Sequence, residues 1–431
     1  MNKEKYYIRA YGCQMNLYEA DVISSIMDKA GFVQVSNERE ADIVYLVTCS
    51  VRSHAENRVL GRLNSLKQLK KSKPDLIIGI LGCMAQNYKG KLSNGHGADL
   101  VVGPDEYRRL PELVDKFTQV HRPQIQTEFN TENYEGILPK VLNKTTGFVS
   151  IMRGCNNYCS YCIVPYVRGR ERSKPKEQVI QEVNNLINNG VKDITLVGQN
   201  VLAWNDDGLK FLDLLKIVDD INGFDRLRFI TSHPKDLTIK HFDVLLTLKK
   251  FCPHIHLPLQ SGSNRIIGLM NRGYSKEEYI QKVKKGREII PDISFTTDVM
   301  VGFPTETDDD FKDTLDVIEQ LKFDFAYMFK YSERPNTEAC EIKPQVNATI
   351  SQKRLTKLIE MQNQITNEKS KELLDKTLEV LVESKNGKQS YARTKTNKVV
   401  ILEEPVETGK TYLCKVIRVA GWTPIGEIVN N

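Results

Sequence analysis

Long hydrophobic segments are missing from this 431-residue chain, because apolar runs such as residues 76–81 are far too short to cross a bilayer. The first residues, MNKEKYYIRAYG, show neither the apolar core nor the cleavage site of a signal peptide. A strong charge bias is missing too, since a net charge of +6 is well below that of a dedicated nucleic-acid-binding protein. These absences favour a cytoplasmic protein with no membrane segment.

A fourth cysteine is missing near the run GFVSIMRGCNNYCSYCIVPYVRGR, where Cys155, Cys159 and Cys162 form a C-x3-C-x2-C pattern. A cubane iron–sulfur cluster takes four ligands, so three thiolates leave one iron open to a ligand that is not protein. Structural zinc usually takes two C-x2-C pairs, and the second pair is absent. A disulfide framework is typical of short secreted chains. The triplet predicts a [4Fe–4S] cluster with one open iron, and zinc is the alternative.

Three more cysteines each follow an apolar run typical of a β-strand. KYYIRAYGC ends at Cys13, ADIVYLVTC at Cys49 and DLIIGILGC at Cys83, with helical patterns at residues 18–30 and 53–69. Such a series predicts a parallel sheet, whose carboxyl strand ends share one edge. The alternative is three separately buried cysteines, since free Cys is among the most buried residue types. Their common position at strand ends favours a second cluster.

Residues 119–145 are polar, contain two prolines and lack periodicity, which is typical of a linker. A second βα series follows it and predicts an open, partial barrel with its chemistry at the carboxyl ends of the strands. Its expected strands are residues 148–152, 193–198, 227–232, 254–259, 293–301 and 325–331. A long charged helix at 351–376 and several short strands then predict a small β-barrel, a type of domain that often binds oligonucleotides. The expected domains are 1–118, 146–370 and 371–431.

The motifs, in this order, resemble the methylthiotransferase family of radical S-adenosylmethionine (SAM) enzymes along nearly the whole chain. The carrying motifs are YGCQMN, TCSVR, LGCMAQ, the cysteine triplet, LVGQNVLAW, SHP, LPLQSGS and RTKTNKVV. GCQMN at the first cysteine is typical of the branch that acts on N6-isopentenyladenosine, whereas its sister branches carry GCKVN or GCPKN. The sequence YSERPNTEA departs from the family pattern YSxRPGTPA, with Asn336 and Glu338 replacing Gly and Pro.

The resemblance implies an α/β fold with an N-terminal parallel-sheet domain, a partial (β/α)6 radical SAM barrel and a C-terminal TRAM barrel. It also implies two [4Fe–4S] clusters, SAM both as methyl donor and as radical source, and methylthiolation of C2 of the isopentenyladenosine at position 37 of tRNA. Expected partners are the tRNA anticodon stem-loop, a sulfur source and an electron donor such as flavodoxin or ferredoxin. The alternatives are a threonylcarbamoyladenosine enzyme and a non-catalytic iron–sulfur RNA-binding protein.

The resemblance assigns the radical SAM cluster to Cys155, Cys159 and Cys162 and the auxiliary cluster to Cys13, Cys49 and Cys83. No side chain is predicted as a catalytic acid or base. Expected SAM contacts lie near the triplet or near the ends of barrel strands, and are Tyr161, Gly198, Gln199, Ser232, Gln260, Ser261, Arg272 and Gly302. Expected RNA contacts lie in two basic stretches flanking the barrel mouth, and are Arg168, Arg170, Arg172, Lys174, Arg393, Lys395 and Lys398.

Overall fold

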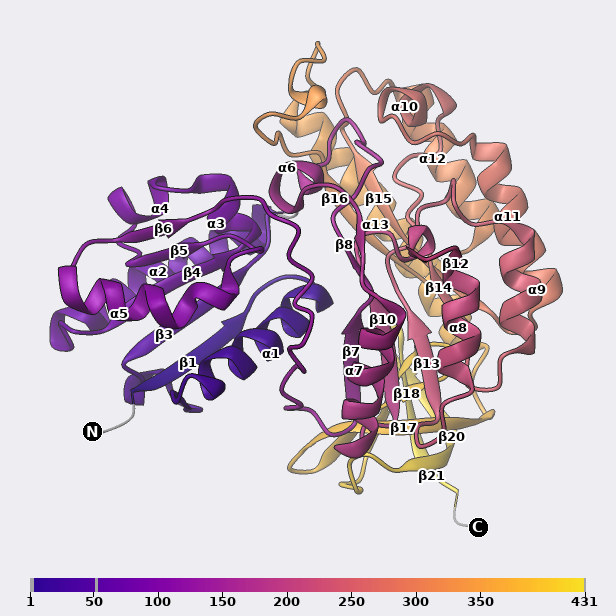
Figure 1. The fold of residues 1–431 in the computed structure, drawn as a ribbon. Coiled ribbons are helices and arrows are strands. Elements are labelled where there is room, and N and C mark those ends of the chain that lie inside the picture. The colour runs from indigo at the N-terminus through magenta and orange to yellow at the C-terminus, as the bar shows by residue number, and fades with distance from the viewer. Residues whose placement is uncertain (1–3, 51–52, 430–431) are drawn as a thin grey trace.

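The computed structural model describes residues 4–50 and 53–429, which form three parts (Figure 1). The N-terminal part is a six-stranded sheet in the order β2-β1-β3-β4-β5-β6, with all neighbouring strands parallel. Its strands are β1 Lys5–Ala10, β2 Val33–Gln34, β3 Ile43–Thr48, β4 Ile77–Gly82, β5 Leu100–Val102 and β6 Gln124–Gln126. Its helices are α1 Gln14–Lys29, α2 Ser53–Ser72, α3 Cys83–Tyr88, α4 Lys91–Asn94 and α5 Leu110–Val120.

The central strands β3 and β4 are buried along their whole length, because helices cover both faces of the sheet. Helices α1 and α5 pack on one face and α2, α3 and α4 on the other. The three strands that are followed by a cysteine, β1, β3 and β4, are adjacent in the sheet, as the parallel-sheet prediction requires. The predicted linker differs from the structure at its start, because residues 119–120 belong to α5 and β6 pairs with β5. A three-residue edge strand with one apolar residue gives no periodic signal.

The central part is the half-barrel, with the two parallel sheets β13-β10-β7 and β14-β15-β16. A bridge between Leu227 and Phe251 connects them. The six strands are β7 Thr146–Ser150, β10 Asp193–Val197, β13 Arg226–Phe229, β14 His254–His256, β15 Ser294–Val301 and β16 Phe325–Lys330. All six predicted barrel strands are therefore present. Short strands, paired as β8-β9 and β11-β12, are β8 Met152–Arg153, β9 Arg172–Ser173, β11 Asn205–Asp206 and β12 Leu209–Lys210.

Helices cover the outer side of the half-barrel (Figure 1). They are α7 Lys176–Asn188, α8 Phe211–Asp219, α9 Ile239–Thr247, α11 Lys276–Ile289, α12 Asp308–Leu321 and α13 Ala348–Lys371. Two short helices lie at the carboxyl ends of the strands instead: α6 Val164–Arg168, next to α3 of the N-terminal domain, and α10 Asn264–Leu269. Helix α7 packs on the half-barrel through one apolar stripe, in which Val179, Val183 and Leu186 are buried in the core cluster. No helix within 4–50 or 53–429 has the length and apolar character needed to cross a bilayer.

The C-terminal part is a closed barrel in the order β17-β18-β19-β21-β20. Its strands are β17 Thr377–Asn386, β18 Gln389–Thr394, β19 Val399–Leu402, β20 Thr411–Ala420 and β21 Thr423–Ile428. Its turn between β18 and β19 packs against the amino ends of the half-barrel strands. Arg228 of β13 donates to the carbonyls of Thr394 and Lys395 at 2.9 Å, and Ser294 of β15 donates to that of Thr396 at 2.7 Å. This barrel therefore lies opposite the end from which the cysteine loop leaves β7.

Asp21 on α1 lies where the N-terminal domain contacts the chain that follows it, and we expect it to make the stability of the protein depend on pH. Burial raises the pKa of Asp21 to about 7, and the nearby Lys140 opposes the shift only in part. An acid with a raised folded-state pKa costs stability progressively as pH rises from about 4 to about 7. Asp21→Asn is therefore expected to raise Tm more at pH 8 than at pH 5. The exposed Asp75→Asn is the control, and an equal gain from Asp21→Asn at both pH values would contradict the assignment.

Candidate functional site

The loop carrying Cys155, Cys159 and Cys162 is fixed by backbone contacts along its length. Cys155 N donates to Gly169 O at 3.2 Å, and Gly154 N donates to the Gln199 side chain at 2.6 Å. Ser160 N donates to Met270 O at 3.0 Å, and Ser160 O accepts from Ala339 N at 2.8 Å. The loop is thus held by chain segments that follow β7, β10 and β14 as well as by the segment after β16.

The N-terminal cysteines Cys13, Cys49 and Cys83 lie at the adjacent carboxyl ends of β1, β3 and β4. Gly12 has φ +115°, and a Cβ there would lie 2.4 Å from Cys49 Cβ, so only glycine permits this approach. Gly82 has φ +93°, and a Cβ there would lie 2.8 Å from Thr48 O. The glycines of the first and third motifs therefore let the chain pass close to Thr48 and Cys49, which lie between them.

The two cysteine sites meet across the boundary between the N-terminal domain and the half-barrel. Cys83 forms a buried cluster with Ile163 and Val167, which lie directly after the third cysteine of the loop and on α6. Arg168 at the end of α6 donates from Nε to Cys83 Sγ at 3.0 Å. One short segment of chain, residues 162–168, therefore joins a radical SAM loop cysteine to a contact with the N-terminal site.

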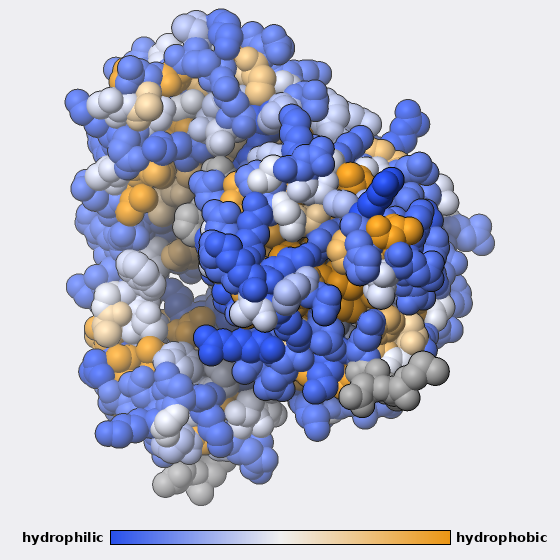
Figure 2. All heavy atoms as spheres, turned by 90° about the vertical axis from the view of Figure 1, so that its left-hand side faces the viewer, coloured by the Kyte–Doolittle hydropathy of each residue, from blue (hydrophilic) through white to orange (hydrophobic). Residues whose placement is uncertain are grey.

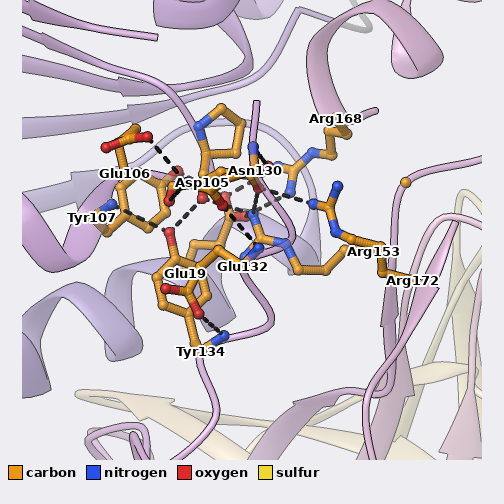
Figure 3. A network of polar contacts seen from close by, with 12 residues as sticks. Glu19, Asp105, Glu106, Tyr107, Asn130, Glu132, Tyr134, Arg153, Arg168 and Arg172 are labelled. Carbon is orange, nitrogen blue, oxygen red and sulfur yellow. Dashed lines mark hydrogen bonds and ion pairs between the residues drawn. The ribbon is translucent and has the colours of Figure 1, made fainter. Parts of the chain in front are cut away.

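Arg168 also belongs to a buried network of ion pairs and hydrogen bonds (Figure 3). The Arg168 guanidinium donates to both carboxylate oxygens of Glu19 on α1, and the Glu19 side chain is fully buried. Arg153 NH2 lies 3.4 Å from both Glu19 and Asp105, and Arg172 pairs with Asp105 at 2.9 Å. Three arginines from the cysteine-loop segment thus meet two carboxylates of the N-terminal domain. Of these arginines, Arg168 acts on the thiols: its charge helps to lower the pKa of Cys13 and opposes the rise in the pKa of Cys83 that burial causes.

The thiols differ in their readiness to ionise. Burial raises the pKa of Cys155 to about 11 and that of Cys162 to about 12, and it also raises the pKa of Cys83. A hydrogen bond with Cys49 lowers the pKa of Cys13 to about 6. Metal binding requires thiolates, so loading the buried thiols releases protons and is favoured by higher pH.

The donors of both cysteine sites are thiols, whose sulfur chemistry is that of iron–sulfur cluster ligands. In the part of the chain that the structure describes, no group of three or more His, Cys, Asp or Glu side chains is gathered to hold a metal ion. In a cubane each thiolate binds a different iron, so the thiols need not surround one point. Cys155, Cys159 and Cys162 lie on one loop, and the other trio follows three adjacent strands, with Cys83 as the first residue of α3. All six are soft sulfur donors suited to iron–sulfur clusters.

Four of the predicted SAM contacts belong to the cysteine loop, touch it, or carry a buried polar atom with no hydrogen-bond partner. They are Tyr161, Arg272, Ser232 and Gln260. Arg272 is 4% exposed, so it is not a surface arginine; it donates from NH1 to Tyr161 Oη at 3.2 Å and to Cys159 Sγ at 3.6 Å. Ser232 Oγ and Gln260 Oε1 are buried without a hydrogen-bond partner. Buried polar atoms normally have partners, so these two are suited to a polar ligand.

The other four predicted SAM contacts have structural roles in the fold. A Cβ at Gly198 would lie 2.7 Å from the Met152 side chain, and the Gln199 side chain already accepts from Gly154 N. Ser261 Oγ accepts from Ser263 N at 3.2 Å, which shapes the start of α10. Gly302 has φ +72°, and a Cβ there would lie 2.2 Å from Ser351 Oγ. Packing and turn geometry therefore account for these residues.

The prediction of RNA contacts by the basic run after the cysteine loop needs correction at two positions. Arg168 is 3% exposed and bound to Glu19, and Lys174 is 2% exposed and paired with Glu182. Neither is available to a phosphate, because each already balances a buried carboxylate. Arg172 is partly exposed but paired with Asp105, which leaves Arg170 as the exposed cation of this run.

The basic residues of the C-terminal barrel lie far from the position expected for them. Arg393 is paired with Glu383, Lys395 lies 3.4 Å from Glu379, and Lys398 donates to Ser370 Oγ at 3.2 Å. Their turn faces the amino ends of the half-barrel strands, so it does not flank the mouth as predicted. Lys395 and Lys398 line a cavity of about 510 Å³ between the two barrels.

The departure at Asn336 is explained by its backbone. Asn336 has φ +69°, a left-handed conformation that asparagine adopts more readily than other non-glycine residues. The loop of this chain therefore keeps a glycine-like backbone at that position.

Sequence reasoning missed the residues that connect the two cysteine sites. Glu19 and Asp105 carry no motif, and their arginine partners follow them in sequence by 48 residues or more. His233 was not predicted as a site residue, yet its Nε2 lies 3.9 Å from Cys159 Sγ, and burial lowers its pKa to about 2. The neutral ring offers one lone pair and one N–H near the loop. The SHP motif was the available signal for it.

Comparison with known proteins adds a family to this geometry. The model of the Radical SAM superfamily matches residues 149–318, and that of uncharacterized protein family UPF0004 matches residues 5–103. A tRNA-2-methylthio-N(6)-dimethylallyladenosine synthase of Caldicellulosiruptor saccharolyticus is 45% identical over 82% of this chain and 77% of its own length. A synthase of the same name from a Thermoanaerobacter species is 42% identical over 98% of this chain and 92% of its own.

Solved structures share the fold at low sequence identity. The radical SAM methyltransferase TsrM from Kitasatospora setae has a TM-score of 0.59 and 14% identity, with 78% of this chain and 77% of that one covered. The cobalamin-dependent radical SAM enzyme OxsB has a TM-score of 0.56 and 12% identity, covering 84% of this chain and 56% of that one. Fold and cysteine loop together define a radical SAM enzyme. More narrowly, the chain belongs to the family of tRNA-2-methylthio-N(6)-dimethylallyladenosine synthases. Enzymes of this family use SAM and two [4Fe–4S] clusters, one of them auxiliary.

Proposed function

We propose that this enzyme methylthiolates C2 of N6-dimethylallyladenosine at position 37 of tRNA. The observation that carries the proposal is the contact of the two cysteine sites through residues 162–168, because sulfur delivery and radical chemistry must act on one carbon. The names of the relatives agree with this substrate. They do not favour the alternatives of a threonylcarbamoyladenosine enzyme or a non-catalytic RNA-binding protein.

Each cysteine trio has a role in this proposal. Cys155, Cys159 and Cys162 would hold the cluster that binds SAM, and the N-terminal trio would hold the auxiliary cluster. When bound, the first cluster supplies the one-electron chemistry that an adenine C2–H bond, without useful acidity, requires. Arg272 orients the loop by contacts with Cys159 and Tyr161, and its burial keeps water away from the loop.

SAM would be oriented by the polar atoms that have no protein partner. Ser232 Oγ and Gln260 Oε1 are suited to hydrogen bonds with its polar groups, and the Arg272 guanidinium is suited to attract its carboxylate. Gln260 has φ +65°, a left-handed backbone conformation that is rare for residues other than glycine and asparagine. Strain of this kind gathers at ligand sites and supports a binding role.

The remaining partners follow from the reaction. The enzyme would take an electron from a protein such as flavodoxin or ferredoxin and sulfur from a separate donor, in the cytoplasm. Its RNA substrate would be the anticodon stem-loop. Arg170 after the cysteine loop is exposed and lies on the mouth side of the half-barrel, so it would bind a phosphate of this RNA.

The proposal is tested by anaerobic reaction of reconstituted enzyme with SAM, a reductant and tRNA that carries N6-dimethylallyladenosine. Mass spectrometry of the nucleosides is expected to show the 2-methylthio product, and the mixture is expected to contain 5′-deoxyadenosine. tRNA with threonylcarbamoyladenosine is the control for the sister activity. Product from that RNA alone would assign the chain to the other substrate, and absence of 5′-deoxyadenosine would refute an enzymatic role.

The number of clusters is tested separately by metal analysis. Reconstituted protein is expected to hold about eight irons, four for each cubane cluster. The Cys155→Ala/Cys159→Ala/Cys162→Ala variant provides the control, with about four irons expected at the remaining site. Saturation of the unmodified protein at about four irons would remove the second cluster from the proposal.

A further inference from the structure

Two tyrosine rings are exposed on the cysteine loop and on the short helix α6 that follows it. Tyr158 directly precedes Cys159 and is 42% exposed, and Tyr166 on α6 is 40% exposed. The two rings meet edge to face, with centroids 6.4 Å apart and an angle of 87° between their planes. Large aromatic side chains are usually buried, so a paired and exposed arrangement calls for an explanation.

The backbone of Tyr158 has an unusual conformation. Its φ is +43°, a left-handed conformation that is unfavourable for a bulky residue. The amide of Asn271 donates to the Tyr158 carbonyl at 3.1 Å, which fixes this conformation from the segment after α10. The tyrosine is therefore presented to solvent by a strained and supported loop. Such strain is found mainly at functional sites.

A further exposed ring and a positive charge lie where the chain leaves α6. Phe129 is 50% exposed, and its ring lies 3.5 Å from where a Cβ at Gly169 would be. Arg170, which follows Gly169 in the chain, is exposed, and its carbonyl lies beside Gly154 in the cysteine loop. The face of the molecule on the side of the N-terminal domain is mostly hydrophilic, with a hollow between that domain and the rest of the chain (Figure 2). Aromatic rings beside an arginine match the composition of surfaces that bind single-stranded nucleic acid.

We propose that Tyr158 and Tyr166 stack with unpaired bases of the RNA loop next to the adenosine that reacts. This inference rests on the proposed function, since it names how the same site holds its tRNA. Bases in an RNA loop are unpaired, so their faces can stack on aromatic side chains. Stacking beside the cysteine loop would fix the neighbouring nucleotides while the target base enters the half-barrel. Arg170 would hold the intervening phosphate.

The test measures the affinity of reconstituted full-length enzyme for a synthetic anticodon stem-loop that carries N6-dimethylallyladenosine. Tyr158→Ala and Tyr166→Ala are each expected to weaken binding roughly 5- to 150-fold, the range for loss of one stacked base. Tyr→Phe at either position keeps the ring and is expected to retain affinity. Tyr→Leu keeps apolar area without a π face and is expected to behave like Ala. Leu246→Ala, which removes a residue of α9 that is 54% exposed, is the control.

Salt dependence separates stacking from charge. Arg170→Gln is expected to lower the slope of log affinity against log salt by about 0.7, the value for one contact with a single strand. The two Ala variants are expected to keep the slope of the unmodified enzyme. Equal Tm and iron content in all variants would show that the loop remains folded.

Two outcomes would overturn this inference without touching the proposed function. In the first, the enzyme binds and modifies the RNA, and both Ala variants bind it as tightly as the unmodified protein. In the second, the variants bind RNA normally but are no longer reduced by flavodoxin, which would assign the rings to the electron donor. Failure of the unmodified enzyme to bind or modify the RNA would instead refute the proposed function.

Discussion

Cys159→Ala is expected to abolish both SAM cleavage and RNA methylthiolation, whereas Cys49→Ala is expected to keep SAM cleavage and lose methylthiolation. Cys159 lies on the half-barrel loop beside Arg272 and His233, where SAM is proposed to bind. Cys49 lies at the end of β3 in the N-terminal sheet and is 4% exposed. Each variant therefore removes a ligand from one trio alone. The measurements are 5′-deoxyadenosine release and nucleoside mass spectrometry.

The choice of Cys49 depends on the contacts between the domains. Cys83 packs against Ile163 and Val167 and accepts from Arg168, so its removal would disturb the radical SAM loop as well. Cys49 contacts Gly12 within its own domain. Cys252→Ala is a suitable control, because this buried thiol lies next to β14 and in neither trio. Equal loss of SAM cleavage in Cys49→Ala and Cys159→Ala would refute separate roles for the two sites.

Strand patterns predicted the architecture because buried parallel strands are almost continuously apolar. β3 and β4 read as apolar runs, and each ends at a cysteine, so their order along the chain predicted a shared edge. The same signal located the six half-barrel strands. The edge strand β6 was missed because a strand paired on one side and three residues long needs few apolar residues.

Charged residues were harder to place, because sequence does not show what neutralises them. The run RGRERSK reads as a solvated basic loop, yet Arg168 and Lys174 are buried against Glu19 and Glu182. Glu19 lies 149 residues upstream of Arg168, which leaves no local pattern to find. The sequence likewise does not show that Arg272 is buried, where it donates to Pro258 O at 2.8 Å and to Tyr161 Oη at 3.2 Å. Both arginines are buried by partners that are distant in the sequence, which the local pattern of residues does not show.

Arg168→Met is expected to destabilise the protein by about 3–5 kcal/mol, the usual cost of leaving one partner of a buried ion pair alone. Arg168 is 3% exposed, and its partner Glu19 is fully buried. Arg170→Gln, two residues along and exposed, is expected to change stability by no more than about 0.5 kcal/mol. Chemical denaturation of the metal-free protein measures both. Similar small effects from the two variants would contradict a role for Arg168 at the domain contact.

A double variant identifies the origin of that cost. In Arg168→Met/Glu19→Gln the buried carboxylate loses its charge, so part of the stability is expected to return. Arg168→Lys keeps the charge but loses the planar group that donates to two Glu19 oxygens and to Cys83 at once. The free energy of unfolding of Arg168→Lys is expected to lie between that of the unmodified protein and that of Arg168→Met. If the stability losses of Arg168→Met and Glu19→Gln simply add in the double variant, the two side chains have no interaction energy with each other.

The same residue should also influence the auxiliary cluster, because Arg168 donates to the sulfur of a proposed ligand. A hydrogen bond and a positive charge near a ligand sulfur stabilise the reduced, more negative cluster. In a Cys159→Ala background, which leaves the auxiliary cluster as the complete site, Arg168→Met is expected to shift its reduction potential to more negative values. Arg168→Lys should shift it less, and Arg170→Gln should not shift it. A potential that is unchanged in Arg168→Met would limit Arg168 to holding the two domains together.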